Sequence, residues 1–130
     1  MKTFTTWKIK HEFESRQDHH VILMDGSRVN GFSPKTLLLS GLAGCSGIDV
    51  VDILEKQRIK FSNFEIVVET TQTEQHPRVF KDIFITYKIK TARENEIKIK
   101  KAVDLSLDKY CGVSAMLKKN SKIHYTIQLL

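Results

Sequence analysis

Residues 33–57 read SPKTLLLSGLAGCSGIDVVDILEKQ, and this stretch decides the fold of the chain. Serine followed by proline indicates a helix start, because serine can cap free amide groups and proline is tolerated at the first helical position. The first half of the stretch places apolar residues on every side of a helix, and such helices are buried. We therefore expect a long buried helix that begins at Ser33-Pro34 and ends at about Gln57.

Three glycines, Gly41, Gly44 and Gly47, recur at every third position of this helix. Each costs roughly 1 kcal/mol relative to alanine in a helix interior. Their repetition indicates that another backbone approaches the helix closely. That backbone can belong to a second subunit or to the same chain, and the pattern does not distinguish the two.

The segments before this helix alternate between apolar and polar residues, which is typical of strands with one buried face. The alternation predicts a first strand at residues 5–13, followed by a hairpin turn at 14–18. A second strand follows at residues 20–24, and a short third strand is possible at 27–29.

The segments after the helix alternate in the same way around two helical stretches. We expect a hairpin of two strands at residues 64–70 and 83–89, and then a helix at residues 99–110 that breaks at Cys111-Gly112. A short helix follows, with Val113, Met116 and Leu117 inward, and a last strand covers residues 123–129. The order ββ(β)-α-ββ-α-α-β predicts an α+β fold with antiparallel sheets and the helices on one face.

Length and composition limit the class of protein. The chain has 130 residues, enough for one domain over residues 1–130 with its own core. No unbroken apolar run reaches the ~18 residues of a membrane span, and the N-terminus lacks the apolar core of a signal peptide. We therefore expect a cytoplasmic protein without a membrane partner.

The net charge of +6 could indicate nucleic-acid binding. However, the lysines at residues 98–122 alternate with acidic residues at 94–108, which is typical of a solvated helix face. There is no phosphate-binding glycine loop, no base-stacking motif and no metal-like spacing among the five histidines. We expect neither nucleic acid, nor a metal, nor a cofactor.

Cys45 and Cys111 are the only cysteines. In a reducing compartment such residues are either small buried groups or reactive thiols. Cys45 lies mid-helix with Asp49 one turn later, and a carboxylate there disfavours a thiolate. Cys111 lies at a helix start, where free amide groups favour one. If the two meet, one can react with a peroxide and the other can resolve it as a disulfide.

These two segments resemble the two cysteine motifs of the OsmC/Ohr family. The first resemblance runs through Ser33-Pro34, Leu42-Ala43-Gly44-Cys45 and residues 49–54, and the second covers residues 108–114. With the matching element order, it extends over nearly the whole chain. It implies an intertwined homodimer whose central helices are buried at the interface, with active sites at the subunit boundary.

The resemblance also implies an activity and its residues. Cys45 would attack organic or fatty-acid hydroperoxides, Cys111 would resolve the product, and a dithiol such as a lipoylated protein would be the reductant. The activating arginine of the family lies in the first hairpin turn, where Arg16 fits and Arg28 is the second choice. These features together imply a peroxidase of the oxidative stress response.

The chain departs from the catalytic pattern of the family at two points. Lys35 and Thr36 stand where the family has a glutamate that pairs with the arginine, and Gly112 replaces a proline that often follows the second cysteine. The chain therefore looks closer to the less characterised OsmC-like branch. The alternative function is a dimeric protein that binds a small apolar or acyl ligand in the interfacial cavity without turnover.

Overall fold

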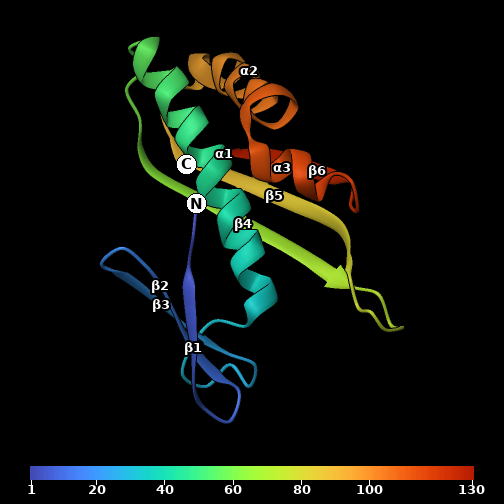
Figure 1. The fold of residues 1–130 in the computed structure, drawn as a ribbon. Coiled ribbons are helices and arrows are strands. Elements are labelled where there is room, and N and C mark those ends of the chain that lie inside the picture. Colours follow the sequence, from blue (N-terminus) through green and yellow to red (C-terminus); the bar gives the residue numbers. More distant parts are fainter. The chain divides into compact units, whose positions relative to one another are not determined.

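The computed structural model describes all 130 residues and contains two compact units. The N-terminal unit is Met1–Leu39 and the C-terminal unit is Ser40–Leu130. Each unit holds one three-stranded sheet, of order β1-β2-β3 in the first and β4-β5-β6 in the second (Figure 1). The long helix α1, Pro34–Lys56, confirms the helix expected from the opening stretch.

The N-terminal sheet consists of β1 (Phe4–Ile9), β2 (Glu12–Gln17) and β3 (His20–Asp25), all antiparallel. The single strand predicted over residues 5–13 is therefore wrong, and so is the turn over residues 14–18. The chain turns after β1, where Lys10 has a positive φ of 51°. Trp7 pairs with Phe13 across β1 and β2. Because both are apolar, the alternation continued through the turn and concealed it.

The predicted third strand at residues 27–29 is a loop organised by one carboxylate. The buried side chain of Asp25 accepts hydrogen bonds from the backbone amides of Ser27, Val29 and Asn30, at 2.8, 3.2 and 3.0 Å. These hydrogen bonds, from Asn30 first, lower the pKa of Asp25. Backbone donors that bond to a carboxylate cannot also pair in a ladder, so the segment stays outside the sheet.

The C-terminal sheet consists of β4 (Ser62–Gln72), β5 (Phe80–Lys90) and β6 (Ile123–Leu129). Strands β4 and β5 form the predicted antiparallel hairpin. The β5–β6 pair is parallel, which is the exception to the antiparallel expectation. The helices between β5 and β6 form a crossover connection, and a crossover of this kind returns the chain in the same direction.

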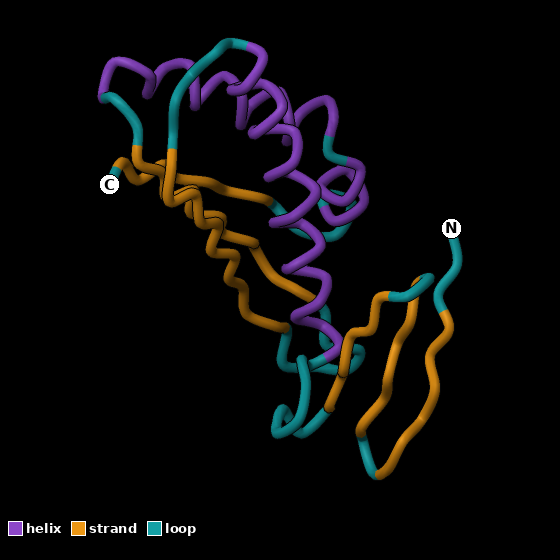
Figure 2. Tube along the Cα trace, turned by 90° about the vertical axis from the view of Figure 1, so that its left-hand side faces the viewer, coloured by secondary structure: helices purple, strands orange, loops and turns teal.

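The helices of the C-terminal unit lie on one face of its sheet (Figure 2). After α1 these are a 3-10 turn (Arg93–Asn95), α2 (Glu96–Leu105), a π-helical turn (Ser106–Tyr110) and α3 (Gly112–Leu117). They pack with the inward side chains of β5 into one core, whose fully buried members include Leu42, Val50, Leu54, Ile83, Ile85, Tyr87, Ile89, Ile99, Ala102 and Val103.

One inward residue of α3 was predicted wrongly. Met116 is 66% exposed, whereas Ser114 is fully buried. The Ser114 hydroxyl lies 2.9 Å from the carbonyl oxygen of Cys111 and 3.1 Å from that of Leu107, both of which can accept its hydrogen bond. A serine with such partners can be buried at little cost.

Helix α1 buries one face and exposes another. Leu42, Val50 and Leu54 are fully buried, but Ile48 is 65% exposed, so a single chain buries only part of the apolar helix. A Cβ on Gly47 would lie 2.8 Å from Cδ1 of Ile66 on β4, which makes this glycine an intrachain contact. Gly41 and Gly44 have no such neighbour within 4 Å.

By length and composition alone, α1 is suited to cross a membrane. The criterion tolerates charged residues, and Asp49 and Asp52 interrupt the apolar run of this helix. Core helices of folded domains meet the same criterion, and the buried residues of α1 belong to the core of the C-terminal unit.

Candidate thiol site

The structure brings the two cysteines together. Cys45 is half-buried on α1, and Cys111 is 3% exposed at the start of α3. Both are free thiols, and they lie close enough that Cys45, after burial, is among the causes that raise the pKa of Cys111. The short helix therefore packs against the middle of the long one, as the thiol hypothesis requires.

Local backbone geometry fixes the sulfur of Cys111. The residue has an extended backbone (φ −75°, ψ 105°) and caps α3, with its Sγ accepting a hydrogen bond from the Ser114 amide at 3.3 Å. On its other side, the Cys111 amide donates to the carbonyl oxygen of Ser106 at 2.7 Å and closes the π-helical turn. Cys111 is thus held from both neighbouring elements.

The electrostatic balance at Cys111 differs from the expectation for a helix start. Burial raises the pKa of the thiol most, and the neighbouring Cys45 raises it further, while the hydrogen bonds from Ser114 lower it. The net direction is upward, so the expected thiolate stabilisation is outweighed. The raised pKa therefore favours the neutral thiol form of Cys111.

A buried polar network surrounds the thiols. The Tyr87 hydroxyl donates to Oγ of Ser46 at 2.9 Å, and burial raises the pKa of Tyr87 to about 12. The hydroxyl of Ser106 donates to Oδ2 of Asp49 at 2.8 Å. No buried side-chain oxygen or nitrogen lacks a hydrogen-bond partner, as expected for a network that is stable inside a core.

Reasoning from the sequence noted Asp49 but missed the serines. Ser46 and Ser106 are fully buried within helices whose other inward residues are apolar, and Ser114 is buried beside Cys111. A serine on an apolar helix face was the available signal. It was not decisive, because serine is common on exposed faces as well.

The predicted activating arginine lies on a strand. Arg16 is an exposed residue of β2, with its guanidinium 5.3 Å from the ring centre of Phe4, and not in a hairpin turn as expected. Arg28 has a positive φ of 57° in the loop after β3. Both belong to the N-terminal unit, whereas both cysteines belong to the C-terminal unit. A catalytic role for either arginine stays a prediction.

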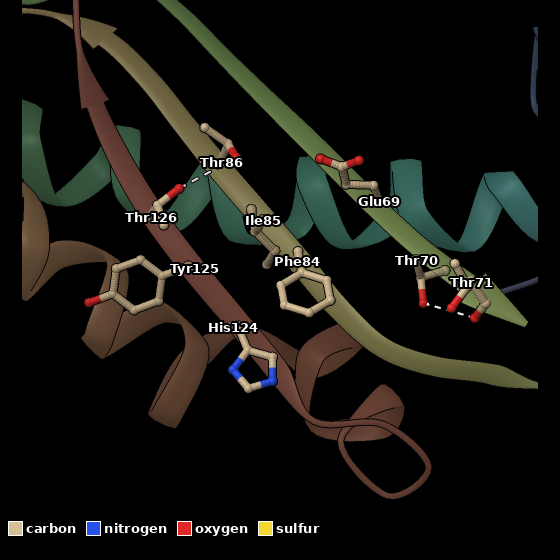
Figure 3. Close-up of a pocket in the computed structure, with 9 residues that line it drawn as sticks. All are labelled: Glu69, Thr70, Thr71, Phe84, Ile85, Thr86, His124, Tyr125 and Thr126. Carbon is tan, nitrogen blue, oxygen red and sulfur yellow. Dashed lines mark hydrogen bonds between the residues drawn. The ribbon is translucent and has the colours of Figure 1, made fainter.

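A hollow of about 500 Å³ lies on the outer face of the C-terminal sheet (Figure 3). Its floor carries Phe84 and His124, whose rings stack with their centres 5.0 Å apart, and His124 lies 2.8 Å from Asp82. Neither cysteine lines it. The two cysteines instead lie on helices α1 and α3, which pack on the helical side of the sheet.

A family profile described as OsmC-like protein matches residues 25–126, which include both cysteine segments. The chain belongs to the OsmC-like family. Among curated OsmC-like relatives, Protein YhfA of Escherichia coli (strain K12) is 38% identical over 113 residues, which cover 85% of this chain and 84% of YhfA. The family resemblance inferred from the two cysteine motifs is thereby confirmed.

Solved structures show the same OsmC-like architecture. A hypothetical protein from Aquifex aeolicus VF5 superposes with a TM-score of 0.85 at 28% identity, over 99% of this chain and 96% of that one. The organic hydroperoxide resistance protein OhrB of Bacillus subtilis superposes with a TM-score of 0.68 at 18% identity, over 98% of each chain. At that identity OhrB is similar to this chain in fold alone.

Proposed function

We propose that this protein is a thiol-dependent hydroperoxide reductase that uses Cys45 and Cys111 as its redox pair. The observation that supports the proposal most is the pairing of two free thiols in one core, one half-buried and one almost fully buried. The substrate class is organic hydroperoxides, and the reductant class is dithiols.

The proposed reaction has three balanced steps. The Cys45 thiolate attacks the distal oxygen of the hydroperoxide, the O–O bond breaks, and the alcohol leaves after taking up a proton. Cys45 is then a sulfenic acid, and the Cys111 sulfur displaces its oxygen as water to form a disulfide. A dithiol reduces this disulfide, regenerates both thiols and becomes a disulfide itself.

The environments of the two thiols support this order of roles. Burial and the neighbouring Cys45 raise the pKa of Cys111, which disfavours Cys111 as the attacking thiolate. Cys45 is also the more exposed of the two, so it is the sulfur that a substrate can reach. The neutral Cys111 thiol can donate a hydrogen bond to the Cys45 thiolate and stabilise it.

The proposed attack by Cys45 calls for a positive charge beside its sulfur. The main causes of the Cys111 shift are burial, Ser114 and Cys45, and none of them is a cation. Arg16 is the predicted source of a positive charge, with Arg28 as the second choice. A reducing cytoplasm would keep both thiols available.

The direct experiment is a consumption assay with an organic hydroperoxide. We expect the protein to consume cumene hydroperoxide in many turnovers with a dithiol such as dihydrolipoamide, and far more slowly with glutathione. After a dithiol has formed a mixed disulfide with the enzyme, its second thiol attacks that bond intramolecularly. The high effective concentration of this second thiol favours release of the reduced enzyme. Consumption no faster than that of the reductant alone would contradict the proposal.

We further propose that the exposed face of α1 is a homodimer interface. An apolar hollow of about 480 Å³ lies between α1 and β4, lined by Ala43, Gly44, Gly47, Ile48, Val51, Asp52, Phe64 and Ile66. Gly41 and Gly44 have open space beside them. Glycines with room for another backbone on an apolar helix face fit a second copy of the same helix.

The dimer proposal predicts the effect of one surface charge. Ile48→Lys places a charge on a 65% exposed residue of this face, so it should leave the monomer fold intact but dissociate the dimer, with an increase in Kd of at least about tenfold. Leu105→Lys on α2, at a residue 42% exposed, is the matched control and should remain dimeric. Analytical ultracentrifugation distinguishes the outcomes, and a wild-type monomer would refute the interface.

The apolar hollow beside α1 also favours a second function, binding of a small apolar or acyl ligand without turnover. Under this alternative Cys45, which does not line the hollow, is a packing residue and not a nucleophile. Two results together would favour ligand binding over the reductase. The wild type would consume no hydroperoxide, and the Cys45→Ser variant would bind decanoic acid as tightly as the wild type does.

A further inference from the structure

We infer that Ser106 and Asp49 are positioning residues that hold the π-helical turn against α1 and so set Cys111 beside Cys45. This inference deepens the proposed function and rests on it. Neither residue touches a sulfur in the contacts described above, and both act through the backbone that carries Cys111.

The position of Ser106 in the chain couples this residue to Cys111. It begins the π-helical turn Ser106–Tyr110, and its carbonyl oxygen accepts the amide of Cys111 at 2.7 Å. A π-helical turn inserts one extra residue into a helix and is frequent at functional sites. Any movement of Ser106 therefore moves the start of α3 and the Cys111 backbone with it.

Ser106 also contacts α1 through its side chain. The hydroxyl is fully buried and lies 2.8 Å from Oδ2 of Asp49 and 3.4 Å from the carbonyl oxygen of Ser46. A hydroxyl has one proton, and the shorter bond, to the carboxyl oxygen of Asp49, is the stronger of the two. Ser46 is the residue after Cys45, so Ser106 connects the backbone that carries Cys45 to the turn that carries Cys111.

The hydrogen bond from Ser106 to Asp49 joins the π-helical turn to α1, and the core around the two elements is apolar. Leu107 and Val103, on either side of Ser106, are buried core residues, and apolar contacts do not fix a rotation or a register as a hydrogen bond does. A displacement of about 1 Å is enough to slow a reaction between positioned groups by up to ~100-fold. The Ser106–Asp49 bond therefore controls the rate of thiol pairing more than the stability of the fold.

The test measures intramolecular disulfide formation with DTNB and without any peroxide. The Cys45 thiolate first cleaves DTNB, gives a mixed disulfide and releases one thionitrobenzoate. The Cys111 thiolate then attacks the Cys45 sulfur of that mixed disulfide, forms the protein disulfide and releases a second thionitrobenzoate. The rate of the second release, followed by absorbance, reports the positioning of Cys111.

We expect Ser106→Ala and Asp49→Ala to slow the second release by about tenfold or more. Asp49→Asn keeps an oxygen acceptor for the Ser106 hydroxyl and should restore most of the rate. The double variant Ser106→Ala/Asp49→Ala should be no slower than either single variant, because both remove the same bond. Ser121→Ala is the matched control, since Ser121 is a buried serine bonded to the Phe80 carbonyl oxygen at 3.3 Å, and its rate should equal that of the wild type.

Each outcome separates this inference from the proposed function. If Ser106→Ala or Asp49→Ala pairs its thiols at the wild-type rate, the positioning role is refuted and the reductase is unaffected. If Ser106→Ala and Asp49→Ala have both lost their folded circular-dichroism spectrum, the Asp49→Asn variant decides the question. A rate of second release that Asp49→Asn does not restore refutes the positioning role. A wild type that pairs its thiols with DTNB but ignores hydroperoxide would refute the reductase alone.

Discussion

The Cys45→Ser variant should lose hydroperoxide consumption by at least about a thousandfold, down to the rate of the reductant alone. A serine hydroxyl is not ionised at neutral pH and cannot form the sulfenic acid, so the first bond-forming step has no nucleophile. The measurement is the initial rate of cumene hydroperoxide loss with excess dithiol. The fold should be unchanged, because oxygen replaces sulfur at a half-buried position.

The Cys111→Ser variant is the matched control for the first prediction. It keeps the attacking thiol, so one equivalent of hydroperoxide should still be consumed per subunit, and the sulfenic acid on Cys45 should become trappable with dimedone. The two variants therefore separate attack from resolution. Equal losses of the first turnover in both would contradict the assigned roles.

The Tyr87→Ala variant should lose about 3–5 kcal/mol of unfolding free energy, the range for removal of a large buried aromatic side chain. Tyr87 is fully buried in the core, and its ring centre lies 6.4 Å from that of Phe64 and 6.1 Å from that of Tyr125. Deletion of the ring leaves a cavity between them. Urea denaturation at a fixed protein concentration measures the loss.

Two variants show whether the ring or the hydroxyl is responsible. Tyr87→Phe removes only the hydrogen bond to Ser46 and should cost about 1 kcal/mol. Phe84→Ala, on the outer face of the same strand and 51% exposed, should cost much less than Tyr87→Ala. A Tyr87→Ala loss no larger than that of Phe84→Ala would show that the core is not organised around this residue.

Much of the fold follows from periodicity. The helix from Pro34 to Lys56, the β4–β5 hairpin and the last strand were all predicted, because each has a regular apolar repeat and clear end signals. The first hairpin was misplaced because Trp7 and Phe13 continue one apolar pattern through a turn. The parallel β5–β6 pair depends on the path of the crossover, which no local repeat encodes.

The thiol site was predictable only in part. Cysteine spacing and the family resemblance identified Cys45 and Cys111, which the fold brings together. The direction of the Cys111 pKa shift was not predictable, because it depends mainly on how deeply the folded chain buries the thiol. The Ser106–Asp49 bond joins residues far apart in the sequence, and its existence depends on the packing of a π-helical turn against α1.

The most direct test of the account is the fate of both thiols after one equivalent of cumene hydroperoxide per subunit, without reductant. The account predicts that free thiols fall from two per subunit to none, and that mass spectrometry of the digest finds one Cys45–Cys111 disulfide within a single chain. Dithiothreitol should then restore both thiols. Two thiols still free under excess hydroperoxide, or sulfur oxidation without that disulfide, would contradict the central claim.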